Sequence, residues 1–299
     1  MTSPARPIRA DTPVAIAPVG DRSWAWRRRL AYTLLIAYAI LMFVPFAWSI
    51  ITSFKTLPDS VRLTILPDPF TLQGWDFAIT KLTPPLPVLF FNSALIAGVV
   101  TVTNLVLGSL AGYAFARLRF PGREVLFLIV LATLMIPDQL RLVPVYLIFN
   151  GIGLTKGVGQ YLGVILVVAI SGTSIFLIRQ YFLTIPRELE EAARIDGAGF
   201  FTTFLRVMLP LAGPALGAVA ILTFQGTRNG FFRPLILLQD QGHYTLPIGL
   251  LFFRTAGGFA TIYPPLMATV VMATLPIVVL YVFFQRYFVE GIAATGVKG

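Results

Sequence analysis

Residues 191–210 read EAARIDGAGFFTTFLRVMLP, a charged and glycine-broken stretch between two long apolar runs of a very hydrophobic chain. Glu188, Glu190 and Glu191 favour the start of a helix here, because carboxylates stabilise the positive end of the helix dipole. Gly197 suits the stop of that helix, since glycine readily adopts the left-handed backbone of a C-terminal cap. The stretch therefore predicts two short helices with a tight corner between them.

The composition of the 299 residues narrows the class of protein. Hydrophobic residues make up 57% and charged residues only 12%, whereas soluble domains carry about 25% charged residues. The mean hydropathy is +0.81, and several apolar runs are close to 20 residues long. Together these features predict an all-α polytopic membrane protein.

Several kinds of chemistry are missing from the sequence. Cysteine is absent and His243 is the only histidine, so no disulfide, thiolate site or metal-ligand cluster is available. No Walker A motif occurs, so any ATP that drives this protein must be bound by another chain. The net charge of +10 is assigned to membrane orientation and anionic lipid rather than to nucleic acid, because the chain has no soluble basic domain.

Six apolar runs are long enough to span a bilayer. They lie at about residues 30–51, 88–114, 125–149, 161–182, 211–238 and 265–288. Pro137 and Pro144 are expected to kink the third run. Six spans place both termini on one side, and the excess of Lys and Arg in the segments on that side predicts cytoplasmic termini.

The pattern divides the chain into successive segments. They are a disordered cytoplasmic tail (1–26), a first transmembrane helix with a proline-rich extracytoplasmic loop (27–87), a transmembrane domain (88–290) and a cytoplasmic C-terminal tail (291–299). The charged segment at 183–210 then faces the cytoplasm. There Ala192 and Ala193 would let a partner approach closely, and Glu191 would offer it a charge. The alternative interpretation is a solvated loop with ordinary helix caps.

The spacing of Glu191-Ala192-Ala193, Gly197 and Leu209-Pro210 resembles the EAA loop of ATP-binding-cassette (ABC) importers. Further elements in matching order make the chain similar to the MalG-type permeases of carbohydrate-uptake importers over roughly residues 28–299. These elements are Thr52-Ser53-Phe54-Lys55, Asn92-Ser93, Ala114-Phe115-Ala116-Arg117, Phe120-Pro121-Gly122, Met135-Ile136-Pro137, Leu246-Pro247 and residues 285–291 (QRYFVEG).

The resemblance implies a type I ABC importer permease fold with six transmembrane helices in the bacterial cytoplasmic (inner) membrane. The implied partners are the lipid bilayer, a second homologous permease subunit, a dimer of ATP-binding-cassette ATPase subunits and an extracellular solute-binding protein. ATP and magnesium would bind to the ATPase, and this chain would bind no cofactor. The implied ATPase-docking residues are Glu191, Ala192, Ala193, Asp196, Gly197, Leu209 and Pro210. The solute would be a sugar or a sugar-like molecule.

Polar residues in or near the spans are candidates for the solute path. They are Asp138, Arg141, Arg228, Asn229 and Arg233. Charges at this depth are costly and tend to face protein or water. One interpretation is a structural Asp138–Arg141 pair, at the i, i+3 spacing of helix neighbours, with the arginines reaching the outer interface. The other is an outer vestibule that favours an anionic or phosphorylated solute over a neutral sugar. Arg228 and Arg233 stand where related permeases commonly have tryptophan, so the solute class stays open.

Two other functions fit so apolar a chain. A stand-alone secondary transporter is disfavoured because no internal repeat and no acidic proton relay is visible. A membrane scaffold that recruits a partner without transport is disfavoured because the proline and glycine breaks suit movement. No nucleophile–base constellation supports an enzyme, so no catalytic or metal-binding residue is assigned.

Overall fold

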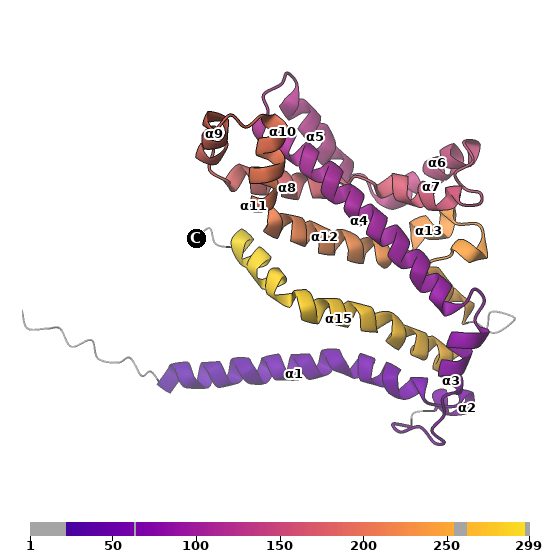
Figure 1. Ribbon diagram of the computed structural model, residues 1–299. Coiled ribbons are helices and arrows are strands. Elements are labelled where there is room, and N and C mark those ends of the chain that lie inside the picture. Colours follow the sequence, from indigo (N-terminus) through magenta and orange to yellow (C-terminus); the bar gives the residue numbers. More distant parts are fainter. Residues whose placement is uncertain (1–21, 63, 254–261, 297–299) are drawn as a thin grey trace, which may run out of the picture. The chain divides into compact units, whose positions relative to one another are not determined.

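The computed structural model describes residues 22–62, 64–253 and 262–296, and within them every regular element is a helix (Figure 1). This confirms the expected all-α class. The chain divides into two compact units, residues 1–48 and 49–299. The described part of the first unit belongs to a single helix, α1 (Arg22–Ser53). That helix begins inside the expected N-terminal tail (1–26), of which residues 1–21 lie outside the described part of the chain.

Membrane-spanning potential is distributed unevenly over the described helices. Residues 26–53 of α1 and the whole of α4 (Leu86–Arg117) are each long and apolar enough to cross a bilayer as single helices. Three further candidates are bent pairs: α5 (Arg123–Leu134) with α6 (Asp138–Gly151), α7 (Gly159–Val168) with α8 (Gly172–Thr184), and residues 200–211 with α12 (Gly213–Arg228). The last region is α15 (Tyr263–Gly296), which is apolar over residues 263–279 and continues into the expected C-terminal tail.

The third expected span, residues 125–149, is broken rather than kinked. Its two helices, α5 and α6, meet at a bend of 99°. Pro137 lies directly before α6, where it can neither donate a backbone hydrogen bond nor allow the preceding residue to stay comfortably helical. Pro144, in contrast, lies inside α6 without ending it. The sequence thus predicted the position of the disturbance at Pro137, but the expected kink is in fact a break between two helices.

The fifth expected span, residues 211–238, is also interrupted. A bend of 74° separates residues 200–211 from α12. The helix α12 ends at Arg228, and a short helix α13 (Phe232–Leu237) follows the turn around Gly230. A single helix over the whole run was the wrong expectation, because Gly213-Pro214 and Gly230 punctuate it.

The helix α4 is central to the second unit and is about 48 Å long at about 1.5 Å per residue. It packs against α7, α8, α12 and the short α14 (Leu246–Gly249). Its backbone lies close to α8 at Gly108 and Gly112, where a Cβ on Gly112 would lie only 3.0 Å from Ile178 Cγ2. The two glycines form a G-x-x-x-G pattern, which allows helix backbones to approach in a membrane.

Two buried asparagines of α4 bind segments outside the long α-helices. Asn92 donates from its amide to the carbonyls of Gly242 and Tyr244, each at 2.9 Å. Asn104 accepts a bond of 3.0 Å from the backbone N–H of Ser171, at the break between α7 and α8. Backbone groups that a helix break leaves unpaired need such partners inside a membrane protein. These bonds explain how α4 supports a bundle with so many broken helices.

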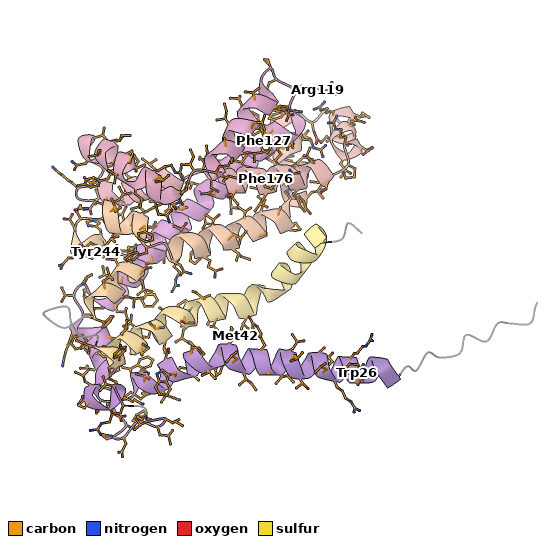
Figure 2. All side chains as sticks on the ribbon, turned by 180° about the vertical axis from the view of Figure 1, so that it is seen from behind. Trp26, Met42, Arg119, Phe127, Phe176 and Tyr244 are labelled. Atoms are coloured by element: carbon orange, nitrogen blue, oxygen red, sulfur yellow. The ribbon has the colours of Figure 1, made fainter. Side chains whose placement is uncertain are left out.

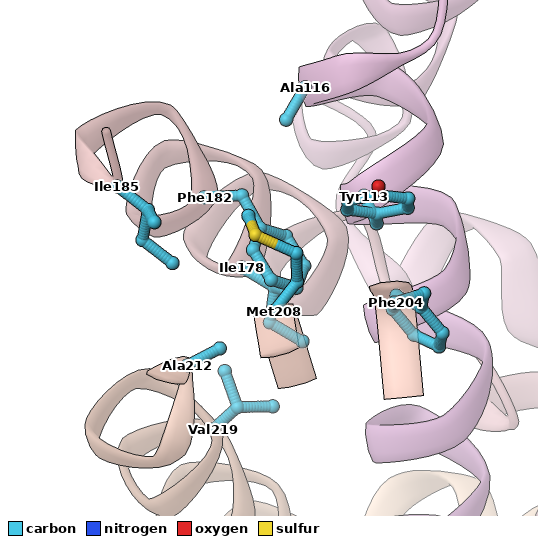
Figure 3. Close-up of a cluster of buried hydrophobic side chains, with 9 residues drawn as sticks. All are labelled: Tyr113, Ala116, Ile178, Phe182, Ile185, Phe204, Met208, Ala212 and Val219. Atoms are coloured by element: carbon cyan, nitrogen blue, oxygen red, sulfur yellow. The ribbon is translucent and has the colours of Figure 1, made fainter. Parts of the chain in front are cut away.

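One end of α4 is fixed by a hydrophobic cluster (Figure 3). The cluster joins α4 and α8 to α12 and to the segment that leads into it, and its members are Tyr113, Ala116, Ile178, Phe182, Ile185, Phe204, Met208, Ala212 and Val219. In a membrane, where lipid is as apolar as these side chains, their packing stabilises the fold through van der Waals contacts between the helices. Beside this cluster, Phe127 of α5 stacks on Phe176 of α8 with ring centroids 6.5 Å apart (Figure 2).

The segment between α1 and α4 forms only short helices, as its prolines predict. They are α2 (Leu57–Ser60), α3 (Gln73–Asp76) and the π-helical turn η1 (Phe77–Lys81). Lys55 is completely buried and donates to the backbone carbonyl of Thr64. The Thr64 hydroxyl in turn donates to Asp59 at 2.8 Å. This network gives a long connection a defined structure.

Candidate functional site

The charged stretch that opened the sequence folds as two short helices and a corner. The first, α9 (Glu188–Ile195), ends at Gly197, whose φ is +81°. The Gly197 N–H donates to the Arg194 carbonyl at 3.0 Å, and the Ala198 N–H donates to the Ala193 carbonyl at 2.9 Å. This pair of bonds is the Schellman cap of a helix. The prediction of a glycine stop at this position is confirmed.

After the corner the chain forms three consecutive short elements. They are α10 (Phe200–Thr203), the π-helical turn η2 (Phe204–Met208) and α11 (Leu209–Leu211). We call residues 188–211 the docking loop. In Figure 1 its helices α9 and α10 lie near the Arg117 end of α4. Phe204 and Met208 belong to the hydrophobic cluster, so one side of the docking loop is anchored to the bundle.

The other side of the docking loop is open. Ile195 is 86% and Phe201 is 68% exposed, and Leu189 and Leu205 are also exposed. Several exposed apolar side chains on one loop are typical of protein interaction surfaces. Glu191, Ala192, Asp196, Gly197 and Pro210 are exposed as well, whereas Leu209 is only partly exposed. A Cβ at Gly197 would meet no atom within 4 Å, so the corner can be approached closely.

Ala193 does not have the exposed position that the sequence predicted for both alanines of the docking loop. It is 9% exposed and faces the bundle, because positions 190 and 193 lie one turn apart on the buried face of α9. Its small side chain therefore serves the packing of α9 inside this chain. Only Ala192 of the alanine pair lies on the open face.

Glu190, which precedes Glu191, is buried in an ion pair. Its Oε1 lies 2.9 Å from Nε of Arg117, with side chains 9% and 5% exposed. The approach is too oblique for a good hydrogen bond, so the contact is a close charge pair. The Tyr113 hydroxyl donates to the other carboxylate oxygen at 3.3 Å, and Arg117 also donates to the Ile185 carbonyl. Removing one partner of a buried pair typically costs about 3–5 kcal/mol.

A second candidate site is a cavity of about 160 Å³ between α6, α7, α13 and the end of α12. Its polar lining is Asp138, Gln139, Thr227 and Arg233, and its aromatic lining is Phe231 and Phe232. Aromatic faces beside hydrogen-bonding groups form the kind of lining that binds polar ligands in an otherwise apolar pocket.

Asp138 joins two helices at this cavity. One of its carboxylate oxygens pairs with Arg141 on α6, and the other pairs with Arg233 on α13. The Asp138–Arg141 pair that the spacing predicts is thus present, with a third member. The three residues also line a smaller neighbouring cavity.

Arg228 and Asn229 do not line these cavities, although their neighbours Thr227 and Gly230 line the larger one. The Arg228 side chain is buried and donates to the Ala273 carbonyl at 2.5 Å and to the Asn229 side-chain oxygen at 3.3 Å. It therefore ties the end of α12 to α15. Of the sequence-predicted solute-path residues, the structure groups Asp138, Arg141 and Arg233 and leaves Arg228 and Asn229 outside.

A family model decides what kind of protein this is. Residues 104–293, nearly two thirds of the chain, match the family described as "Binding-protein-dependent transport system inner membrane component". The chain belongs to this family. It is therefore an ABC transporter permease, and the matched region includes both the docking loop and the cavity.

Curated relatives of this permease extend over most of its length. The arabinooligosaccharide transport permease AraQ of Halalkalibacterium halodurans is 38% identical over 90% of this chain and 97% of its own. The trehalose/maltose permease MalG of Thermococcus litoralis is 34% identical over 89% and 96%. The sn-glycerol-3-phosphate permease UgpE of Yersinia enterocolitica is 31% identical over 78% and 83%.

Solved structures support the fold of the permease. A bacterial ABC transporter involved in import of the acidic polysaccharide alginate superposes with a TM-score of 0.78 at 24% identity, covering 91% of this chain and 100% of that chain. A second structure, of an alginate ABC transporter with its periplasmic protein bound to alginate pentasaccharide, gives a TM-score of 0.60 at 15% identity. It covers 86% of this chain and 93% of that chain.

Sequence reasoning missed the contacts that several residues of the permease make in the structure. Arg117 and Glu190 form the buried pair, and Gln139 and Thr227 line the cavity. The G-x-x-x-G pattern at 108–112 was readable as a helix-packing signal. No sequence signal distinguishes Glu190 from Glu191, because the two belong to the same charged run and only tertiary contacts separate them.

Proposed function

We propose that this permease is the membrane-spanning subunit of an ABC importer that is driven by a partner ATPase and supplied by an extracellular solute-binding protein. It would pair with a second, homologous permease subunit. Family membership favours this function over a stand-alone secondary transporter and over a scaffold. The observation that carries the proposal is the docking loop, a capped corner with one anchored side and one open side.

The open side of the docking loop has the properties that an ATPase contact requires. It combines exposed apolar groups such as Ile195 and Phe201 with the charge of Glu191. Apolar anchors with a charged neighbour supply affinity and orientation in protein interfaces. In this proposal the docking loop faces the cytoplasm, both termini are cytoplasmic, and ATP and magnesium bind to the ATPase and not to this chain.

The solute is proposed to be a neutral oligosaccharide. Relatives are named for arabinooligosaccharides and trehalose/maltose, and another for the anionic sn-glycerol-3-phosphate. In the cavity, Asp138 engages both Arg141 and Arg233, so one carboxylate is shared between two guanidiniums and the three residues together carry a net charge of +1. Gln139, Thr227 and two aromatic rings remain to receive hydroxyl groups. The neutral solute is therefore proposed from the relatives named for sugars and from these uncharged groups, and not from the charges of the cavity.

The docking role is tested by a charge reversal with a matched control. We expect Glu191→Lys to reduce co-purification of the cognate ATPase with the permease pair by at least about tenfold, equal to about 1.4 kcal/mol. Glu188→Lys is the control, because Glu188 is also exposed and also lies in the first turn of α9. It carries the same helix-dipole penalty.

Equal retention of the ATPase by wild type and Glu191→Lys would contradict the docking role. An equal loss with both variants would instead show that the helix, and not the Glu191 contact, was damaged. Circular dichroism and gel filtration of the permease pair separate a lost contact from a lost fold.

A further inference from the structure

Adjacent glutamates of α9 point in different directions. Glu191 is exposed, whereas Glu190 is 7% exposed and faces the bundle. Consecutive helix residues are rotated by about 100°, so a helix that is half buried separates them in this way. If Glu191 contacts the ATPase, as the proposed function requires, Glu190 has a separate role inside the permease.

Glu190 connects α9 to α4 by side chains. Its partners, Arg117 and Tyr113, both belong to the last turns of α4. The direct chain connection from α8 to α9 is weaker, because it passes through Ile185 in an extended conformation (φ −73°, ψ 130°) and then Pro186. Because this connection is not helical, it couples the orientation of α9 to that of α8 only weakly. The Glu190–Arg117 ion pair instead holds α9 directly to α4.

The opposite end of α4 has its own buried polar contacts. Asn92 donates to the carbonyls of Gly242 and Tyr244, and the Ser93 hydroxyl accepts from the Leu246 N–H at 2.8 Å. Between Asn92 and Arg117 the helix is unbroken, a distance of about 38 Å at about 1.5 Å per residue. One rigid element therefore links the docking loop with residues 242–246.

We propose that α4 is a lever that carries movement of the docking loop to the 242–246 segment, and that Glu190 is a positioning residue that couples α9 to α4, beside the buried contacts of Phe204 and Met208. This inference rests on the proposed function. Glu191 then contacts the ATPase. Glu190 transmits to α4 the movement that the ATPase imposes on the docking loop. Chains of packed and hydrogen-bonded groups on rigid elements are the means by which distant sites couple.

The absence of cysteine from the sequence allows a site-specific test in the assembled transporter. Gln241 is exposed beside the segment that Asn92 holds, so Gln241→Cys gives a single label site. The measurement is the rate of maleimide labelling of this introduced thiol in the complete complex, with and without ATP and vanadate. ATPase co-purification and ATP hydrolysis are recorded on the same samples.

We expect ATP and vanadate to change the labelling rate in the complex that carries only Gln241→Cys. Adding Glu190→Gln should retain the ATPase but reduce that change at least about fivefold, the lower end of typical coupling between sites. Asn92→Ala, at the other end of the lever, should have the same effect. The exchanged pair Arg117→Glu with Glu190→Arg should restore part of the response. Glu191→Gln is the control, in which ATPase retention falls but the response of each retained complex persists.

The proposal is overturned if Glu190→Gln and Asn92→Ala both keep the full labelling response, or if Glu190→Gln loses the ATPase as Glu191→Gln does. If Glu190→Gln loses the bundle fold, the labelling response of Asn92→Ala decides, because that variant leaves the Glu190–Arg117 ion pair intact. A wild-type complex that binds no ATPase would refute the proposed function itself, and the lever with it.

Discussion

In the chain segment that follows α1 and precedes α4, the buried residues Lys55 and Asp59 share the hydroxyl of Thr64. Thr64 Oγ1 donates to Asp59 at 2.8 Å and accepts from Lys55 at 3.1 Å. The Thr64 bond, followed by a backbone bond from Asp68 and the charges of Lys55 and Arg62, holds the pKa of Asp59 below its ordinary value. A carboxylate in this state stabilises the segment only while it is ionised.

The lowered pKa predicts how this segment responds to acid. The stabilisation that the ionised Asp59 carboxylate gives to the folded segment is fully present above the ordinary aspartate pKa of about 4. It is lost as the pH falls through the lower pKa of the folded state. Hydrogen exchange of residues 55–72, corrected for intrinsic rates, should show constant protection from neutral pH down to that point and a loss below it. Asp59→Asn should be less protected at neutral pH and should show no such loss. Equal protection of the two proteins at neutral pH would contradict the role of Asp59.

At the scale of the elements, close packing of α4 on α8 makes a separate prediction. Gly112→Val should destabilise the permease by about 1–3 kcal/mol, because the added methyl groups must displace the tightly placed Ile178 side chain. Gly98→Val on the same helix is the control, since a Cβ there meets no atom within 4 Å. Thermal unfolding in detergent measures both variants. A midpoint for Gly112→Val that equals that of Gly98→Val would contradict the packing account.

Element by element, the sequence predicted what local rules decide. The stop at Gly197 follows from glycine's backbone freedom, and the corner after it follows from the same residue. The 99° break at Pro137 was expected only as a kink, because the proline marks the position but not the angle. The angle at a helix break depends on distant side chains that hydrogen-bond the backbone groups left unpaired there. Asn104, for example, accepts from the Ser171 N–H at the break between α7 and α8.

The candidate site was predictable to a similar extent. The motif positions Glu191 and Gly197 fall on the open face of the docking loop. The inward orientation of Glu190 could not be read from the chain, because it is set by Arg117, more than seventy positions earlier. Arg233 reaches Asp138 across an even longer separation in sequence. Contacts of this range are decided by tertiary packing, which spacing alone does not report.

At the scale of the whole molecule, the family and the fold describe a permease that needs other chains to work. The described residues offer an open docking loop, a small polar cavity and a continuous helix between distant segments. The proposed partners explain why each of these features is present. An ATPase would cover the docking loop, and a binding protein would deliver the solute to the second permease and this one.

ATP-driven uptake by the reconstituted complex tests this account most directly. Proteoliposomes would contain this permease, its cognate second permease and the ATPase, with the binding protein added outside and ATP inside. The account predicts accumulation of a labelled neutral oligosaccharide that requires ATP, the ATPase and the binding protein, and that Glu191→Lys abolishes. Uptake by this permease alone, without ATP or ATPase, would contradict it and would identify a secondary transporter instead.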